Sequence, residues 1–194
     1  FGRDEYKTLK TLTRELEVDF FATAFDFASA DFLAELDVPA FKIASGDLRN
    51  IPLIRHVAAF EKPMLVSTGG ASMVDVDRAY NEIMPLNSQL CIMQCTAGYP
   101  AEFKELDLMV IATYRDRFPD AVIGYSGHDN GIAMSTVAYV LGARVVEKHF
   151  TLNKASQVIR DHTLSATPAE LREMVDLGGE VANLVHVIDG GRRA

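Results

Sequence analysis

Residues 121–130 read AVIGYSGHDN, a short apolar strand followed by a glycine-flanked histidine. Side chains alternate between the two faces of a strand, so Ser126 and His128 point the same way. Downstream, residues 145–149 read VVEKH, a second apolar run that also ends in a histidine. If both strands lie parallel in one sheet, the imidazoles of His128 and His149 stand at the same end of it. That geometry is typical of a two-histidine metal site in a barrel mouth, and a pair of hydrogen-bonded structural histidines is the alternative.

Strand-like and helix-like runs alternate along the chain. Strands are expected to begin near residues 19, 40, 64, 90, 121 and 145, and a helical pattern follows each of them. The expected helices span residues 4–18, 29–36, 51–60, 74–84, 106–118 and 132–141. A last helix opens on the capping box of residues 167–170, TPAE, and runs to about residue 188. Regular alternation predicts parallel strands joined by right-handed crossovers, as in a barrel or a doubly wound sheet.

Polar residues follow the ends of these strands, which favours an α/β fold of the (β/α)8 TIM barrel type with its active face at the strand carboxyl ends. Neither a G-x-G-x-x-G nor a G-x-x-x-x-G-K-[ST] motif occurs, so both nucleotide-binding interpretations lose support. A closed barrel needs eight strands in roughly 250 residues. Because six strands are predicted, the first two βα units are expected to be missing. Residues 1–189 are interpreted as a partial barrel domain and residues 190–194 as a linker or tail.

Composition restricts the partners. The formal net charge of −8 argues against non-specific binding to nucleic acid and to an anionic membrane surface. The apolar runs are too short for a transmembrane helix, and no secretory signal is visible. Cys91 and Cys95 are too far apart along one strand to form a disulfide without distortion. Both are expected to be reduced, in a cytoplasmic protein.

Two further segments carry chemistry. Residues 41–47 read FKIASGD, which places Lys42 inside an apolar strand. Lys42 has three interpretations: an edge residue with its head in solvent, a cation for a phosphate or carboxylate, or a Schiff-base amine. Residues 67–70, STGG, turn backbone N–H groups toward phosphate oxygens or form an ordinary turn. Tyr99 covers a pocket or packs on its rim, and Lys148, which alternates away from His149, is expected to face the helix layer.

The motifs taken in order resemble one family, the sialic acid synthases, which make N-acetylneuraminate and related nonulosonic acids. The resemblance covers about residues 20–180 and rests on five segments at matching strand ends. These segments are FKIASGD (41–47), LVSTG (65–69), QCTAGYP (94–100), GYSGH (124–128) and EKHFT (147–151). Any one of them is a weak signal, whereas five in order are specific.

The resemblance implies a TIM barrel that condenses phosphoenolpyruvate with an N-acylated aldose, either N-acetylmannosamine or its 6-phosphate. It implies a divalent metal, Mn or Mg, held by His128 and His149, and a homodimer with small-molecule substrates. It assigns Lys42 to the phosphate and Asp47 to the acidic position of the lysine motif. It assigns the hydroxyls of Thr23, Ser45, Ser67 and Ser126 to contacts with phosphate. It places Tyr99 and Asp161 near the sugar.

Some family features differ. Gln94 stands where many bacterial members carry His, and Ala97 where some carry Asn; Gln94 and Asp47 look more like the vertebrate-type enzymes. A glutamate and a lysine on the family's first two strands, and its C-terminal antifreeze-like domain, are not in this sequence.

The chemistry that these residues suit begins with attack of phosphoenolpyruvate C3 on the metal-polarised aldehyde of the sugar. Water, deprotonated by Asp47, then captures C2, and phosphate leaves with C–O cleavage against the charge of Lys42. Two alternatives stay open. One is a Schiff-base aldolase that uses Lys42, and the other is a non-catalytic sugar-phosphate-binding barrel remnant. Borohydride trapping with substrate separates the aldolase from the synthase, which is sensitive to chelators instead.

Overall fold

The strands of the computed structural model, which describes residues 1–155 and 159–188, occur in the sheet in sequence order, β1-β2-β3-β4-β5. They are β1 (Phe41–Ile43), β2 (Met64–Ser67), β3 (Leu90–Cys95), β4 (Val122–Gly127) and β5 (Val145–Lys148). A doubly wound sheet reverses its strand order at a switch point, whereas a (β/α)8 barrel keeps sequence order. The order therefore confirms the barrel-type α/β fold. The expected linker or tail at 190–194 lies outside the described residues.

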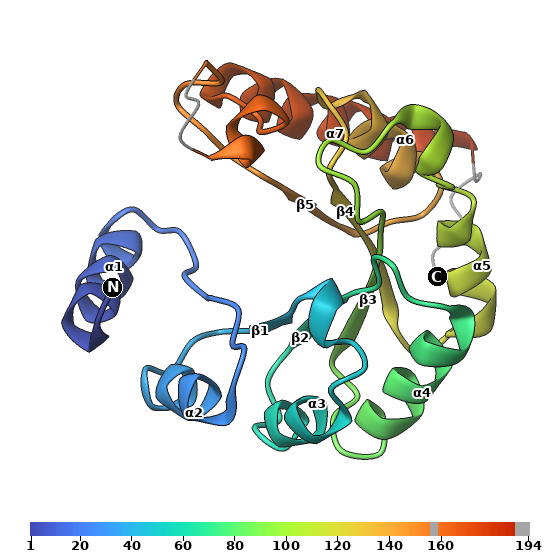
Figure 1. Ribbon diagram of the computed structural model, residues 1–194. Helices are drawn as coiled ribbons and strands as arrows, with labels where there is room; N and C mark the ends of the chain where they lie inside the picture. The colour runs from blue at the N-terminus through green and yellow to red at the C-terminus, as the bar shows by residue number, and fades with distance from the viewer. Residues whose placement is uncertain (156–158, 189–194) are drawn as a thin grey trace. The chain divides into compact units, whose positions relative to one another are not determined.

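Helices alternate with the strands as predicted, apart from two that precede β1 (Figure 1). They are α1 (Arg3–Glu15), α2 (Phe27–Glu35), α3 (Ile51–Ala58), α4 (Met73–Ile83), α5 (Val110–Arg117), α6 (Ala133–Val140) and α7 (Pro168–Ile188). Three short 3-10 helices complete the list: η1 (Ser45–Asp47), η2 (Phe103–Glu105) and η3 (Arg160–Thr163). Among the described residues, none of the helices combines the length and the apolar character needed to cross a membrane.

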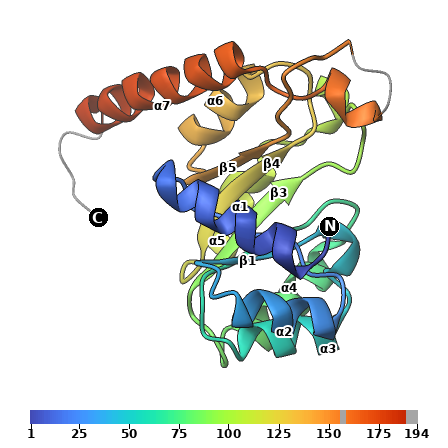
Figure 2. The ribbon, with the colours of Figure 1, turned by 90° about the vertical axis from the view of Figure 1, so that its left-hand side faces the viewer.

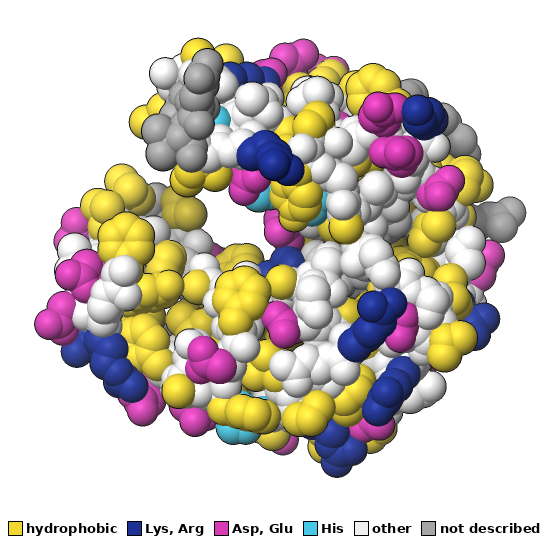
Figure 3. Space-filling model, viewed as in Figure 1, with side chains coloured by type: hydrophobic (Ala, Val, Ile, Leu, Met, Phe, Trp, Pro, Cys, Tyr) yellow, Lys and Arg dark blue, Asp and Glu magenta, His cyan; other side chains and the backbone are white. Residues whose placement is uncertain are grey.

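The chain divides into two compact units, and the first comprises Phe1–Val66 and Ala71–Cys91. Strands β1 and β2 pair in parallel, with Lys42 opposite Leu65. Helix α3 packs between α2 and α4, and its buried side chains include Leu53, Ile54 and Val57. Helix α1 buries no residue fully. On the face seen in Figure 3, hydrophobic side chains gather over α1 and α2. The large exposed ones in this region are Phe1, Leu12, Leu16, Val18, Phe21, Phe25 and Phe27.

The second unit comprises Ser67–Gly70 and Ile92–Ala194. Strands β4 and β5 pair in parallel, with Ser126 opposite Glu147 and Gly127 opposite Lys148. Helices α6 and α7 lie side by side, and α6 packs on both strands (Figures 1 and 2). Tyr125 is fully buried in this core. Strand β4 is therefore held between the neighbouring strand β5 and helix α6.

Two element predictions differ most from the structure in extent. The strand expected at 19–25 is reduced to Thr23, which forms an isolated parallel bridge with Lys42. Its neighbours Phe21 and Phe25 stay exposed, so the segment lacks the two-sided burial that stabilises a parallel strand. The helix expected from residue 106 begins only at Val110, because Asp107 has φ of 45° and this left-handed conformation cannot continue a helix. The capping box of α7 is confirmed: Thr167 N donates to Glu170 Oε2, and Glu170 N donates to Thr167 Oγ1.

Candidate metal centre

The two strand-end histidines lie together in the second unit, as the alternation of side chains predicts. Because Ser126 is opposite Glu147 in the register, His128 and His149, two residues further along each strand, come to the same end of the sheet on the same face. Their ring centroids are 5.3 Å apart and the ring planes differ by 48°. His128 is buried and His149 is half-buried. The pair therefore forms a small site that is open on the His149 side.

Each imidazole has an oxygen near Nδ1. His128 Nδ1 lies 2.8 Å from the backbone oxygen of Thr96, and Cys95 Sγ lies 3.7 Å from the same nitrogen. A carbonyl oxygen only accepts hydrogen bonds, so Nδ1 of His128 carries the proton and donates it. His149 Nδ1 lies 3.9 Å from Asp161 Oδ2, an electrostatic contact rather than a hydrogen bond. The hydrogen bond to Thr96 therefore leaves Nε2 of His128 as the nitrogen with a lone pair, as in histidines that bind metal.

The pKa values of the two imidazoles shift in opposite directions. Burial lowers the pKa of His128, but the hydrogen bonds with Cys95 and Thr96 more than offset it, so the net shift is upward. Burial also lowers the pKa of His149, and the nearby His128 ring lowers it further, against the raising effect of Asp161. His149 is therefore the more readily deprotonated ring, and His128 is the ring for which a cation has to compete with a proton.

Tyr99 forms an aromatic wall beside both imidazoles. Its ring centroid lies 4.1 Å from that of His128 at a tilt of 31° and 5.9 Å from that of His149. The neighbouring Ala101 N donates to the backbone oxygen of His128 at 3.0 Å, which fixes the Tyr99 segment to the end of β4. With 41% of its surface exposed, Tyr99 presents an accessible ring face and hydroxyl to a ligand. Both interpretations from the sequence hold in part, since the side chain packs on the site and remains reachable.

The two imidazoles are the candidate metal ligands of this site. In the described ranges, no group of three or more His, Cys, Asp and Glu side chains is arranged to hold a metal. Two imidazoles alone would leave the remaining coordination positions of a bound ion to water or substrate oxygens. Imidazole nitrogens also suit a transition metal better than magnesium, which is bound mainly by oxygen.

The remaining predicted site residues divide between the units. In the second unit, Ser67 and Ser126 are buried at the ends of β2 and β4. In the first unit, Lys42 is 7% exposed and its Nζ donates to the backbone oxygen of Ile43. Thr23 bridges Lys42, and η1 carries the half-buried Ser45 and Asp47 directly after β1. The buried position of Lys42 excludes the interpretation of an edge residue with its head in solvent.

Sequence reasoning missed a buried polar cluster behind the two histidines. Lys148 does point away from the face that carries Glu147, as predicted. The carboxylate that it pairs with, Asp129 Oδ1 at 3.3 Å, was not predicted. The sequence does place a charged residue directly beside each histidine: Asp129 follows His128, and Lys148 precedes His149.

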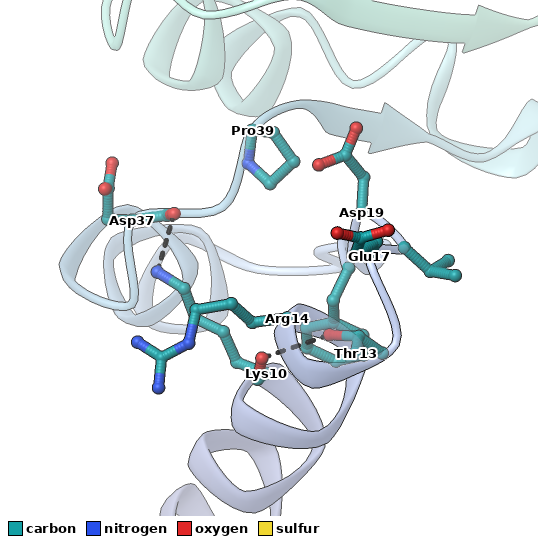
Figure 4. A pocket seen from close by; sticks show the side chains of 9 residues that line it. Lys10, Thr13, Arg14, Glu17, Asp19, Asp37 and Pro39 are labelled. Atoms are coloured by element: carbon teal, nitrogen blue, oxygen red, sulfur yellow. Dashed lines mark hydrogen bonds between the residues drawn. The ribbon is translucent and has the colours of Figure 1, made fainter.

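A separate pocket lies in the first unit, beside the carboxyl end of α1 (Figure 4). Its volume is about 470 Å³, and its wall includes Lys10, Arg14, Glu17, Asp19 and Asp37. Lys10 Nζ donates to the backbone oxygen of Asp37 at 2.9 Å. Both cations and carboxylates line this wall, and none of the predicted site residues does. It is therefore not the candidate site.

Comparison with known proteins identifies relatives along almost the whole chain. A family model described as the NeuB family matches residues 1–188. N-acetylneuraminate-9-phosphate synthase of Mus musculus is 42% identical over 175 residues, which are 90% of this chain and 48% of that protein. The chain thus spans about half the length of this curated relative.

Two solved structures are similar in fold as well as in sequence. An N-acetylneuraminic acid (sialic acid) synthetase from Leptospira borgpetersenii, in complex with citrate, has a TM-score of 0.92 and 31% identity. The match covers 95% of this chain and 64% of that one. The spore coat polysaccharide biosynthesis protein SpsE of Bacillus subtilis has a TM-score of 0.88 and 38% identity, covering 96% of this chain and 52% of that one.

Proposed function

The chain belongs to the NeuB family, and from that premise we propose that it is the barrel part of a nonulosonic acid synthase. The proposed reaction condenses phosphoenolpyruvate with an N-acylated aldose to give a sialic-acid-type product and phosphate. N-acetylmannosamine and its 6-phosphate are the proposed acceptors, and the 9-phosphate in the name of the mouse relative favours the phosphorylated one. The observation that carries the proposal is the convergence of His128 and His149, with both Nδ1 atoms turned to oxygens.

The proposed site binds a divalent cation, manganese in preference to magnesium, through Nε2 of His128 and His149. Such a cation supplies a Lewis acid for the aldehyde oxygen of the open-chain sugar. In the proposed site, Thr96 accepts a hydrogen bond from Nδ1 of His128 and Asp161 lies beside Nδ1 of His149, which would leave the Nε2 atoms for the cation. Tyr99 offers its exposed ring face to the sugar.

The other predicted residues have defined roles in the proposed reaction. C3 of phosphoenolpyruvate forms a bond to the aldehyde carbon with the electrons of the C2–C3 double bond, while the carbonyl π bond breaks and the aldehyde oxygen takes up a proton. Water adds to the cationic C2 as Asp47 accepts its proton. The C2–O bond to phosphate then breaks, phosphate leaves with the electron pair, and the C2 hydroxyl loses its proton to give the ketone. Lys42 balances the charge of the phosphate, assisted by the hydroxyls of Thr23, Ser45, Ser67 and Ser126.

We also infer that the enzyme is a cytoplasmic homodimer. The resemblance to the sialic acid synthases supports the dimer. Cys91 and Cys95 are both buried cysteine thiols, which fits a reducing compartment.

Metal binding gives the most direct test. Titration calorimetry of the chain with Mn²⁺ is expected to show one site, and His128→Ala and His149→Ala are each expected to abolish it. His56→Ala is the matched control, because His56 lies on α3 in the first unit and pairs with Asp31 there. Saturable Mn²⁺ binding that survives both site substitutions would overturn the proposed metal centre.

The reaction itself is tested by phosphate release from phosphoenolpyruvate, measured against a panel of N-acylated hexosamines with and without chelator. Chelator-sensitive release with an N-acylated mannosamine is the expected result. A covalent adduct with Lys42 after borohydride treatment in the presence of substrate, together with turnover that resists chelators, would favour the Schiff-base aldolase instead.

A further inference from the structure

A buried ion pair links the two segments that carry the imidazoles. Gly127 is opposite Lys148 in the register of β4 and β5, so Tyr125, Gly127 and Lys148 share one face of the sheet. That face is opposite to the one on which Ser126 and Glu147 stand. The chain thus places polar groups on both faces at this end of the two strands, the histidines on one face and the ion pair on the other.

The contacts within the pair are short and fully enclosed. Asp129 Oδ1 accepts a hydrogen bond from Tyr125 Oη at 2.7 Å and lies 3.3 Å from Lys148 Nζ. Lys148 Nζ also donates to the backbone oxygen of Asp129. The side chains of Lys148 and Asp129 are 2% and 0% exposed. The Lys148 ammonium is therefore bonded to both the side chain and the main chain of the residue that follows His128.

The second carboxylate oxygen of Asp129 has no such partner among the described residues, so the charge of Asp129 depends on the contacts of Oδ1. Asp129 Oδ2 is buried and makes no hydrogen bond within the part of the chain that the structure describes. A buried charge is costly unless it is paired and hydrogen-bonded, so compensation for this carboxylate comes through Oδ1, from Tyr125 and Lys148. Displacing either donor would leave Asp129 with less compensation, which would favour a movement of the backbone at residue 129.

Gly127 makes room for this arrangement. A Cβ atom at residue 127 would lie 2.7 Å from the Tyr125 ring and 2.9 Å from Asp129 Oδ1. Both distances are well inside van der Waals contact. Any side chain at this position would push the Tyr125 hydroxyl and the Asp129 carboxylate apart. Residues 125, 127, 129 and 148 therefore form one steric and electrostatic unit.

We propose that the Asp129–Lys148 ion pair is the positioning device that holds His128 and His149 at metal-binding distance. Each histidine is covalently adjacent to one member of the pair, Asp129 to His128 and Lys148 to His149. A displacement of either charged residue therefore passes through a single peptide unit to an imidazole. Groups behind the ligands of a metal site commonly change its affinity by about 10–100-fold when they are altered. The inference rests on the proposed metal centre.

Mn²⁺ affinity, measured by calorimetry on the whole chain, is the first readout. Asp129→Asn and Lys148→Met are each expected to weaken it by about 10–100-fold. The control is Ile111→Ala, which removes buried methyl groups from α5 in the same unit and lowers the denaturation midpoint without touching the pair. Unchanged Mn²⁺ affinity in the control, against a loss in the two pair variants, is the expected pattern. An equal loss in all three at matched stability would overturn the positioning role.

The second readout does not need a metal. Ring-proton NOEs between His128 and His149 are expected in the metal-free protein, because the ring centroids are 5.3 Å apart. They are expected to weaken or vanish in Asp129→Asn and to persist in Ile111→Ala. NOEs that are present in a wild-type chain that binds no Mn²⁺, but are lost in Asp129→Asn, would support the positioning role while the metal centre fails. If Asp129→Asn keeps both the NOEs and the wild-type Mn²⁺ affinity, the positioning role is wrong, whereas the proposed metal centre is not contradicted.

If Asp129→Asn and Lys148→Met do not fold, Tyr125→Phe provides the test instead. It removes the hydroxyl that donates to Asp129 Oδ1 but leaves both charges of the pair in place. A several-fold loss of Mn²⁺ affinity with a weaker NOE is expected. Wild-type values for both would count against the proposal.

Discussion

The backbone oxygen of Thr96 lies 2.8 Å from Nδ1 of His128. This contact comes from the loop after β3 and acts on a ring at the end of β4. It assigns the proton of the neutral imidazole to Nδ1 and the lone pair to Nε2. A cation at Nε2 therefore competes with the second proton of His128, whose pKa lies above its usual value.

Mn²⁺ binding should depend on pH through this competition. Affinity is expected to rise as pH increases through the raised pKa of His128 and then to level off, because His149, with its lowered pKa, is already neutral there. Calorimetry in buffers of different ionisation enthalpy is expected to detect close to one released proton below the plateau. A flat affinity between about pH 5.5 and 8 would contradict the assignment of these rings as ligands.

Gly127→Ala is expected to destabilise the chain by about 1–3 kcal/mol, the usual cost of overpacking a closed core. The added methyl group would meet the Tyr125 ring at 2.7 Å and Asp129 Oδ1 at 2.9 Å. Gly46→Ala is the matched control, since a Cβ there has no neighbour within 4 Å. Urea denaturation of the two variants measures the difference. Equal stability of the two variants would mean that the residues around Gly127 can shift to accept the added methyl group at little cost.

Glu170 should make stability depend on pH at the start of α7. A hydrogen bond from Lys154, and then one from the Thr167 backbone, lower the pKa of Glu170 to about 2 from its usual 4.5. A lowered pKa in the folded state means that the stabilisation is present above pH 4.5 and is lost as pH falls toward 2. Glu170→Gln should therefore be less stable than wild type near neutral pH, and the gap should close in acid. A gap that is constant with pH would exclude a charge effect.

Thr167→Ala tests the other half of the same capping box. It removes the hydroxyl that accepts from Glu170 N at 3.3 Å, and a loss of about 0.5–2 kcal/mol is expected. Thermal or urea unfolding measures the loss. The loss of stability in Thr167→Ala should change little with pH until Glu170 itself is protonated. The loss in Glu170→Gln, by contrast, should depend on pH.

Two glycines inside α7 offer a gain in stability. Gly178 and Gly179 lie within Pro168–Ile188, and a Cβ at either has no neighbour within 4 Å. Gly178→Ala and Gly179→Ala are each expected to stabilise the chain by about 0.5–1 kcal/mol, because alanine loses less backbone entropy in a helix. An unchanged or lower denaturation midpoint would indicate that this stretch of α7 needs the freedom of glycine.

The strand-end histidines show what local pattern predicts well. Alternation in the segments around Ser126 and Glu147 sets which side chains share a face, and parallel pairing then brings His128 and His149 to one end. The α7 capping box was equally predictable, because both of its hydrogen bonds lie within one turn. In these cases the partners are near in sequence, or are related by a simple strand period.

The wrong predictions concern features that local composition does not determine. The strand predicted at 19–25 has a suitable apolar composition, but only Thr23 finds a bridging partner. The left-handed Asp107, which delays α5, is likewise not visible in the helical periodicity around it. Strand formation depends on a neighbour elsewhere in the chain, and a single backbone conformation depends on local packing, so neither follows from composition.

The amino-acid sequence alone determined the family, the order of strands and helices, and the face on which each imidazole stands, because these follow from short periodic patterns and motif order. Only the tertiary structure decided which groups hold the imidazoles in place. Thr96 reaches His128 from the preceding strand's loop, Asp161 reaches His149 from η3, and Lys148 finds Asp129 across two strands. These partners are separated by 12 to 32 residues or lie on different strands, and a hydrogen bond depends on distance in space, which no local pattern encodes.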